Sequence, residues 1–374
     1  MEKHKLSATS ENPWVRGRLA RILLKNAGKM PAYPAKNEVF GGCLSQPLGR
    51  RNVLKALLAA NAGVALNGLF PGCVSQSPDA DVFIGKADNY SAEITSLIRE
   101  GFEELNVTAG EIRGKRVLLK ANIVEPHFGR EHIVTHPAVV LAAAEAFLSL
   151  GAEEITVAEG AGHCRDTYRI LEESGFDGIL GNPKIKFTDL NYDDWWLTLN
   201  TGVKTHLVSF FLPAALKQAD WIVSMPKLKA HHWAGITLSM KNLFGVLPGS
   251  FYGWPKNVLH SAGIIKSILD INATVRPHFA IVDGIVGMEG DGPIMGSAKK
   301  AGIIVMGRNL PAVDATCARC MGINPRKIEY LADADEWLGT IRESRIRQRG
   351  ESWKAVRSDF QLLDYIEAQK GLRL

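Results

Sequence analysis

The sequence predicts an α/β fold, a mainly parallel, doubly wound sheet with a β-hairpin insertion. Three observations favour this fold. Short and wholly apolar runs such as residues 117–119 and 221–223 are typical of strands that helices cover on both faces. These runs alternate with amphipathic segments of helical length. A chain of 374 residues is also long enough to bury a full core.

Strands and helices follow one another in order along the chain. The expected strands are residues 81–84, 117–119, 155–158, 185–190, 221–223, 279–282 and 303–306, and the expected helices are residues 90–105, 137–148, 166–175, 213–218, 257–275 and 311–321. Pro137 and Pro311 fall in first helical turns, where a missing N–H is tolerated. Asp166 can cap its helix, and Gly151 and Gly175 can end theirs. Repeated alternation of this kind implies a mainly parallel sheet.

Residues 193–211 interrupt the alternation. They contain Trp195 and Trp196, and residues 205–210 alternate between polar and apolar side chains. Residues 201–202 are a Thr-Gly pair that suits a turn. This segment therefore predicts the β-hairpin insertion.

The charge of the chain is unevenly distributed. The whole chain has 44 Lys and Arg and 39 Asp and Glu, a net charge of +5. Residues 1–73 hold 11 of the basic and 3 of the acidic residues, which leaves 33 basic and 36 acidic residues in the remainder. The remainder is therefore mildly acidic, and its charge gives no reason to expect nucleic-acid binding.

The basic excess belongs to residues 1–73, a leader that we expect to be mostly disordered. Arg50 and Arg51 stand before a moderately apolar run, residues 56–70, that is too short and too rich in Ala and Gly for a firm membrane span. This order predicts a twin-arginine-type export signal. The export machinery is then a partner, the membrane is contacted only through the leader, and the destination is the periplasm or cell envelope. A chance arginine pair before a short amphipathic helix is the alternative, and whether the leader is cleaved or Cys73 is lipidated stays open.

The cysteines do not form a disulfide framework. They are Cys43, Cys73, Cys164, Cys317 and Cys320, and three of them follow the leader. Two cysteines with CxxC spacing on one predicted helix, without a second pair, are more typical of small buried side chains than of metal ligands. The body of the chain therefore lacks a complete set of iron–sulfur cysteines.

Polar residues gather where the predicted strands end. Residues 226–232 follow the strand at residues 221–223, and we expect them to form a loop because Pro226 stops the strand. Open α/β sheets bind ligands at the carboxyl ends of their strands, where side chains far apart in sequence converge. The expected ligand-binding residues are Lys120, Asn122, Glu159, Lys227, Asn242 and Asp283, and the expected catalytic residues are Lys229, His231 and Lys241.

These residue types indicate an anionic ligand. Lysines around one crevice repel one another, which lowers their pKa values and favours an anion. A less basic lysine can act as a general base, and a histidine can transfer a proton near neutral pH. Glu159 and Asp283 can either neutralise the lysines or hold a divalent metal with His231, so the cofactor stays undetermined. The sequence contains no Walker A motif, no GxGxxG after a strand, no GxSxG and no HExxH.

Structural roles compete with these functional ones. Lys120 can simply extend from a strand end toward solvent, and Asp283 before Gly284 is typical of a turn. Lys229, His231 and Lys241 are harder to explain in this way, because three basic groups beside an apolar run cost desolvation energy.

Several short motifs occur in an order that resembles a known family. They are Lys120-Ala-Asn122, Thr135-His-Pro137, residues 226–231 (PKLKAH), residues 240–245 (MKNLFG), Asp283-Gly-Ile285, Met288-Glu-Gly290, Gly292-Pro293 and Val313-Asp314. Over residues 81–331 the chain resembles the "domain of unknown function 362" family. The resemblance implies no settled activity. Some members of that family append a ferredoxin-like segment with iron–sulfur cysteines, which this chain lacks.

Three functions remain open from the sequence. The first is an exported enzyme that binds a carboxylate- or phosphate-bearing small molecule, with or without a metal. The second is a non-catalytic metal or cofactor carrier, or an accessory factor of a redox complex in the envelope. The third is a scaffold that binds a partner through an exposed aromatic patch at Trp195 and Trp196. Residues 332–374 are expected to be a charged C-terminal extension.

Overall fold

The structure, a computed structural model, describes residues 80–91, 93–125, 129–176, 178 and 181–374. The predicted leader, with Arg50, Arg51, Cys43 and Cys73, lies outside the described residues, and its export signal stays a prediction. Within the described ranges, no helix is both long enough and apolar enough to cross a bilayer.

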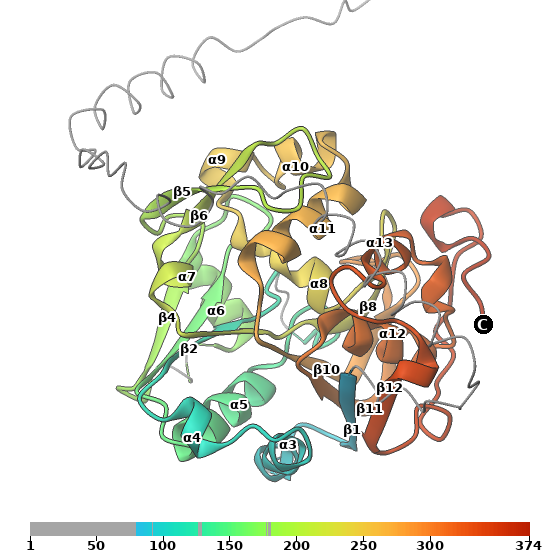
Figure 1. The fold of residues 1–374 in the computed structure, drawn as a ribbon, viewed down its shortest axis with the longest axis horizontal. Coiled ribbons are helices and arrows are strands. Elements are labelled where there is room, and N and C mark those ends of the chain that lie inside the picture. Colours follow the sequence, from blue (N-terminus) through green and yellow to red (C-terminus); the bar gives the residue numbers. More distant parts are fainter. Residues whose placement is uncertain (1–79, 92, 126–128, 177, 179–180) are drawn as a thin grey trace, which may run out of the picture. The chain divides into compact units, whose positions relative to one another are not determined.

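A mainly parallel sheet organises the residues that the structure describes. Its strands are β1 (Ala80–Lys86), β2 (Arg116–Lys120), β3 (Glu154–Glu159), β4 (Ile185–Asp189), β7 (Trp221–Ser224), β8 (Lys227–His231), β9 (Gly235–Thr237), β10 (Phe279–Glu289), β11 (Ser297–Gly307) and β12 (Ile346–Gly350). Their order is β12-β1-β11-β10-β7-β2-β3-β4, and β8 and β9 branch from β10 (Figure 1). The run from β10 to β4 pairs in parallel, whereas β11 is antiparallel to its two neighbours. The predicted α/β fold is confirmed.

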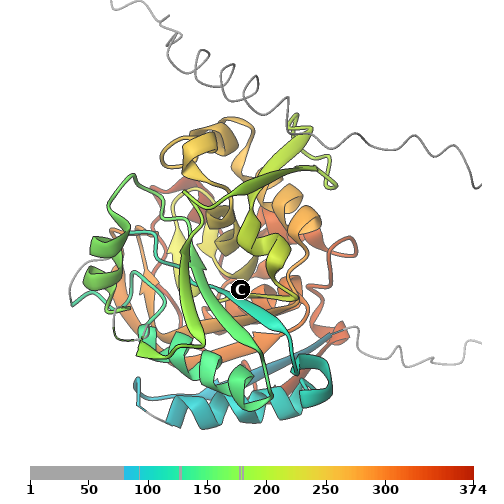
Figure 2. The same ribbon diagram turned by 90° about the vertical axis from the view of Figure 1, so that its left-hand side faces the viewer.

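Helices cover both faces of this sheet (Figures 1 and 2). One face carries α3 (Glu93–Glu104), α4 (Ala109–Ile112), α5 (Pro137–Ser149) and α6 (Thr167–Ser174), and the other carries α7 (Ala214–Gln218), α8 (Ser239–Asn242), α11 (Ile264–Val275), α12 (Leu310–Cys320) and α13 (Glu329–Ala334). Leu118 of β2 packs into one of the two cores, and Val117 and Leu119 pack into the other. The unbroken apolar run at this strand therefore reflects burial on both faces.

The predicted hairpin is present, with β5 (Trp195–Leu199) paired to β6 (Ser209–Pro213) in antiparallel. The predicted limits of α6 are also confirmed. Asp166 accepts a hydrogen bond from the backbone N–H of Arg169, and Gly175 ends the helix in the left-handed conformation.

Some elements differ from the expectation, and three of them lie close to the predicted site residues. The helix expected over residues 257–275 is two helices, α10 (Asn257–Ser261) and α11, separated by Gly263 at a φ of 99°. Residues 227–231 form strand β8 rather than a loop, because β8 pairs with β10 on one side and with β9 on the other. β10 continues past Asp283 to Glu289 because β11 remains paired with it.

The charged C-terminal segment packs with the rest of the described chain. Its strand β12 pairs in parallel with β1, and Phe360 is fully buried. Arg347 and Arg349 of β12 both contact the Asp81 carboxylate, and the Nη2 of Arg347 lies 3.0 Å from Asp81 Oδ2. Ion pairing to β1 thus explains how a segment rich in arginine can lie along the sheet edge. The remaining short helical elements are η3 (Leu243–Val246), α9 (Gly249–Tyr252), η4 (Pro325–Lys327), η5 (Glu343–Arg345) and η6 (Glu367–Gln369).

Candidate functional site

A cavity of about 330 Å³ opens beyond the carboxyl ends of β2, β3 and β8. Six of the nine predicted site residues line it, namely Lys120, Asn122, Glu159, His231, Lys241 and Asn242. Apolar side chains, among them Val124, Phe244, Ile294 and Met295, form much of the remaining wall. Its volume and mixed lining are typical of small-molecule sites, and its position is the one expected in an open α/β sheet.

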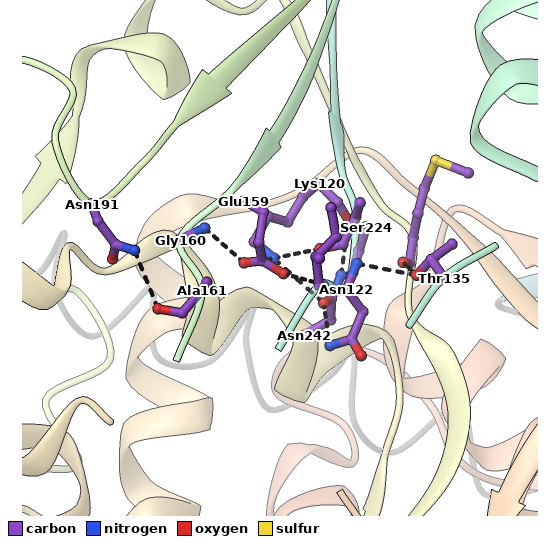
Figure 3. Close-up of polar contacts among 12 residues, drawn as sticks. Lys120, Asn122, Thr135, Glu159, Gly160, Ala161, Asn191, Ser224 and Asn242 are labelled. Carbon is purple, nitrogen blue, oxygen red and sulfur yellow. Dashed lines mark hydrogen bonds and ion pairs between the residues drawn. The ribbon is translucent and has the colours of Figure 1, made fainter. Parts of the chain in front are cut away.

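Lys120 and Glu159, which both line the cavity, form a buried ion pair (Figure 3). The Nζ of Lys120 lies 2.7 Å from Glu159 Oε1 and also donates to the carbonyl of Ala121. The carboxylate accepts two further hydrogen bonds, from the backbone N–H groups of Ile123 at 2.6 Å and Gly160 at 2.7 Å. Burial lowers the pKa of Lys120, while Glu159 opposes that shift. The charge of this lysine is therefore neutralised within the protein.

Two glycines allow this pair to form. A Cβ on Gly245 would lie 2.5 Å from Glu159 Oε1 and 2.8 Å from Lys120 Nζ. A Cβ on Gly160 would lie 2.4 Å from the carbonyl oxygen of Gly245. Both positions require glycine because β3 and η3 approach each other directly beside the ion pair.

Asn122 and Asn242 extend the polar network from the ion pair (Figure 3). Asn242 donates through Nδ2 to the Lys120 carbonyl at 2.9 Å and to Ser224 Oγ at 3.1 Å, which fixes the orientation of its amide. Its Oδ1 accepts from Asn122 Nδ2 at 3.1 Å. The Oδ1 of Asn122 is then left buried without a hydrogen-bond partner among the described residues. Most buried side-chain acceptors in proteins have a hydrogen-bond partner.

Lys227 and Asp283 meet each other but do not line the cavity. The Nζ of Lys227 lies 2.6 Å from Asp283 Oδ2, and neither side chain is exposed to solvent. Tyr90 accepts from Lys227 at 3.0 Å, and Asp283 accepts the backbone N–H of His136 at 2.9 Å. The structure therefore places these two predicted ligand-binding residues in a buried ion pair that joins β8 to β10.

Lys229 also lies behind the cavity wall. Its Nζ donates to the carbonyl of Ile133 at 2.8 Å and to that of Pro293 at 3.3 Å, and the side chain is fully buried. Burial holds the pKa of Lys229 well below its usual value, and the nearby Lys241 lowers it further. In this position Lys229 anchors the turn at Pro293, which itself lines the cavity.

Lys241 presents an unpaired amino group to the cavity. Among the described residues no carboxylate or hydrogen-bond acceptor pairs with its Nζ, which lies 5.0 Å from the centre of the Phe244 ring. Burial lowers the pKa of Lys241 to about 8. Helix α8 carries this lysine, and the buried Asp314 holds the start of α8 by accepting the N–H groups of Ser239 at 2.8 Å and Met240 at 3.0 Å.

His231 is a neutral hydrogen-bond donor. Its Nδ1 accepts the backbone N–H groups of Trp233 at 2.9 Å and Ala234 at 3.3 Å, so Nδ1 carries no proton. Burial holds the pKa of His231 well below its usual value, and Lys241 lowers it further. The proton of the neutral ring therefore lies on Nε2, the ring nitrogen that the backbone leaves unengaged.

Lys256 and His260 are among the lining residues that the sequence analysis missed. Lys256 is buried in the left-handed conformation at a φ of 71°, which is uncommon for a residue other than glycine and recurs at functional sites. Its Nζ donates to Asn191 Oδ1 at 2.6 Å, and burial lowers its pKa to about 7. Neither residue follows a predicted strand, so the strand-end pattern could not identify them.

Metal ligands do not gather in the described part of the chain, where no group of three or more His, Cys, Asp or Glu side chains is arranged to hold an ion. Glu159 and Asp283, which the sequence offered as metal ligands beside His231, are each paired with a lysine. Cys317 and Cys320 are buried, and burial raises the pKa of both thiols. They pack in the core as small apolar side chains.

Comparison with known proteins identifies similar sequences and folds. A family model described as "Domain of unknown function (DUF362)" matches residues 117–319. The chain is 27% identical over 232 residues to the "Thylakoid-associated protein sll1697" of Synechocystis sp., a match that covers 60% of this chain and 68% of the relative.

Solved structures are similar only at a distance. A Thermotoga maritima protein has 12% identity and a TM-score of 0.37, over 62% of this chain and 59% of that chain. The lactate racemase apoprotein of Thermoanaerobacterium thermosaccharolyticum has 13% identity and a TM-score of 0.35, over 59% of this chain and 53% of that chain. This chain thus spans less than two thirds of the length of either.

Proposed function

The chain belongs to the family described as a domain of unknown function (DUF362), and from its site we propose an enzyme that binds a small carboxylate- or phosphate-bearing molecule in the cavity. The observation that supports this most directly is the Lys241 amino group, which lines the cavity without a carboxylate partner among the described residues. A partly buried cation is costly to desolvate, and an anionic ligand would supply the missing counter-charge.

The charge balance of the cavity also favours an anion. The lysines that line it are Lys120, Lys241 and Lys256, and the carboxylates are Glu159 and Asp291. Glu159 is occupied by Lys120, and Asp291 is a partly exposed residue that contacts His232 at 3.3 Å. Lys241 and Lys256 are therefore left facing the cavity without acidic partners, and both can contribute to an anion subsite.

Acid–base chemistry is the reason for proposing an enzyme rather than a simple binding protein. Burial brings the pKa of Lys241 to about 8 and that of Lys256 to about 7, close to neutral pH. Groups with pKa values near the working pH are the most effective proton donors and acceptors. Such shifts cluster at active sites, where burial and like charges act together.

The proposal is tested by changing Lys241 to Met. Binding of a panel of carboxylates and phosphate esters is measured by calorimetry for the wild type, for Lys241→Met and for Lys217→Met, a control on the exposed side of α7. We expect Lys241→Met to lower affinity for every anion that binds by about tenfold or more, because a charge-assisted contact is lost. Its melting temperature should stay close to that of the wild type, because Lys241 makes no ion pair in the described structure.

Two results would count against the proposal. If Lys241→Met binds the panel as the wild type does, the cavity lysine is not the anion site. If no carboxylate or phosphate binds the wild type at millimolar concentration, the anion-binding function itself is excluded. Lys217→Met controls for the loss of one positive charge elsewhere on the protein, and it should bind the anions as the wild type does.

A further inference from the structure

His260 lines the same cavity as His231 and Lys241 and has a defined tautomer. Its Nδ1 lies 3.1 Å from the carbonyl oxygen of Lys256. A carbonyl oxygen can only accept a hydrogen bond, so the proton of this contact belongs to Nδ1. In the neutral ring Nε2 then carries a lone pair, and it has no hydrogen-bond partner among the described residues.

His231 has the opposite arrangement. Its Nδ1 accepts two backbone N–H groups, which leaves the proton on Nε2. Both rings pack against Trp233, with ring-centre distances of 6.4 Å for His231 and 4.9 Å for His260. The backbone thus fixes one histidine as a donor and the other as an acceptor, and both line the cavity.

The surroundings of His260 favour its neutral form. Burial is the main cause that lowers its pKa, and the nearby positive charge of Lys241 lowers it further. His232 also faces it, and Lys256 contributes its carbonyl group to Nδ1. A neutral His260 keeps the Nε2 lone pair available to accept a hydrogen bond from a ligand.

We infer that the ligand is a hydroxylated anion, whose charged group contacts Lys241 and whose hydroxyl group donates a hydrogen bond to Nε2 of His260. This inference rests on the proposed anion-binding function and narrows its ligand class. The Nε2–H of His231 faces the same ligand as a donor. An anion without a hydroxyl would leave the His260 lone pair unmatched in a partly buried site, which costs affinity.

A packing role for His260 does not account for this arrangement. Its ring contacts Phe244, with ring centres 5.2 Å apart, as well as Trp233. Those contacts would form with any ring of similar size, and the Lys256 contact uses only Nδ1. A variant that keeps the Nδ1 contact and removes Nε2 therefore tests recognition of the hydroxyl group through the preference between matched ligands, since the loss of the ring contacts affects both members of a pair alike.

His260→Asn is that variant, since the Asn amide can donate to the Lys256 carbonyl from a position close to that of Nδ1. The probes are two matched pairs, 3-phenyllactate with 3-phenylpropionate and glycerol phosphate with propyl phosphate. Each pair differs mainly in hydroxyl groups, and one pair carries a carboxylate while the other carries a phosphate. Affinities are measured by calorimetry and melting temperatures by scanning fluorimetry.

We expect the wild type to bind the hydroxylated member of at least one pair about 3- to 10-fold more tightly, which corresponds to the net free energy of one hydrogen bond. His260→Asn should lose that preference, whereas the loss of its ring contacts with Trp233 and Phe244 should affect both members of a pair alike. The pair that shows the preference identifies the charged group as carboxylate or phosphate.

The outcomes separate this inference from the proposed function. Equal binding of both members by the wild type, or a preference that survives in His260→Asn, overturns the hydroxylated ligand but leaves anion binding intact. Binding of no probe by the wild type, together with no effect of Lys241→Met on the wider panel, overturns both.

Discussion

Lys227 donates to Asp283 across 2.6 Å, and neither side chain is exposed to solvent. The pair bridges β8 and β10, two strands that meet in parallel at these residues. Both residues belong to motifs that also mark the family, yet neither lines the cavity. Their position indicates that part of this motif set builds the sheet that supports the site, while Lys241 and His231 line the cavity.

Replacing one partner of this ion pair should destabilise the protein more than replacing both partners with apolar residues. Asp283→Asn leaves Lys227 buried without a counter-charge, and we expect it to lower the free energy of unfolding by about 3–5 kcal/mol. The double variant Lys227→Met with Asp283→Leu should recover much of that loss, because no buried charge remains. Urea denaturation measures both. A single variant as stable as the wild type would contradict the pairing.

The parallel sheet was predictable because strands buried on both faces have a recognisable sequence pattern, an unbroken apolar run such as residues 117–119. Strand β8 lacked that signature, since Lys227, Lys229 and His231 are buried only through hydrogen bonds that join distant segments. Such pairings depend on the folded chain and leave no local pattern. The same holds for β12, whose arginines are matched by Asp81.

The candidate site was predictable to the extent that it lies at strand ends. Lys120, Asn122 and Glu159 follow β2 and β3, and the topology brings them together. Lys256 and His260 come from a turn and a short helix, where neither periodicity nor strand position marks them. Their proximity to the cavity depends on how η3 and α10 fold over the sheet, which the sequence pattern does not specify.

Asp314 should make stability depend on pH. Burial raises its pKa to about 7, above the value of about 3.9 expected for an unfolded chain. A carboxyl group with a higher pKa in the folded state binds its proton more tightly there. Its contribution to stability is therefore greatest below pH 4 and is lost as the pH rises to about 7.

Denaturation at several pH values checks this expectation. The free energy of unfolding of the wild type minus that of Asp314→Asn should fall between pH 4 and pH 7, by at most about 1.4 kcal/mol per pH unit. The Asn variant has one acceptor oxygen for the two N–H groups of Ser239 and Met240, a loss that does not depend on pH, and it has no proton to lose. Parallel profiles for the two proteins would show that Asp314 is not protonated in the folded state.

Anion affinity should decrease in alkaline solution. An anion stabilises the charged forms of Lys241 and Lys256, whose pKa values in the unliganded protein are about 8 and about 7. Below about pH 6 both amino groups are largely charged, so affinity is nearly constant. Above these values binding requires proton uptake, and affinity should fall by up to about tenfold per pH unit for each linked proton.

A carboxylate probe such as 3-phenylpropionate suits this measurement because it does not titrate between pH 6 and pH 9. Calorimetry in buffers of different ionisation enthalpy reports the proton uptake directly. Lys241→Met should remove the component near pH 8 and leave the one near pH 7. An affinity that does not change from pH 6 to pH 9 would exclude both lysines as the anion contact.

The predicted export signal can be tested by mutation of the leader. Twin-arginine recognition depends on the paired guanidinium groups, so Arg50→Lys with Arg51→Lys should retain the protein in the cytoplasm, although the charge of the leader is unchanged. Fractionation of the native host, followed by immunoblotting, locates the protein. Arg16→Lys with Arg18→Lys is the matched control, because it makes the same exchange elsewhere in the leader. Normal export of the Arg50/Arg51 variant would mean that the arginine pair is a chance feature, whereas retention of both variants would point to a general loss of leader function.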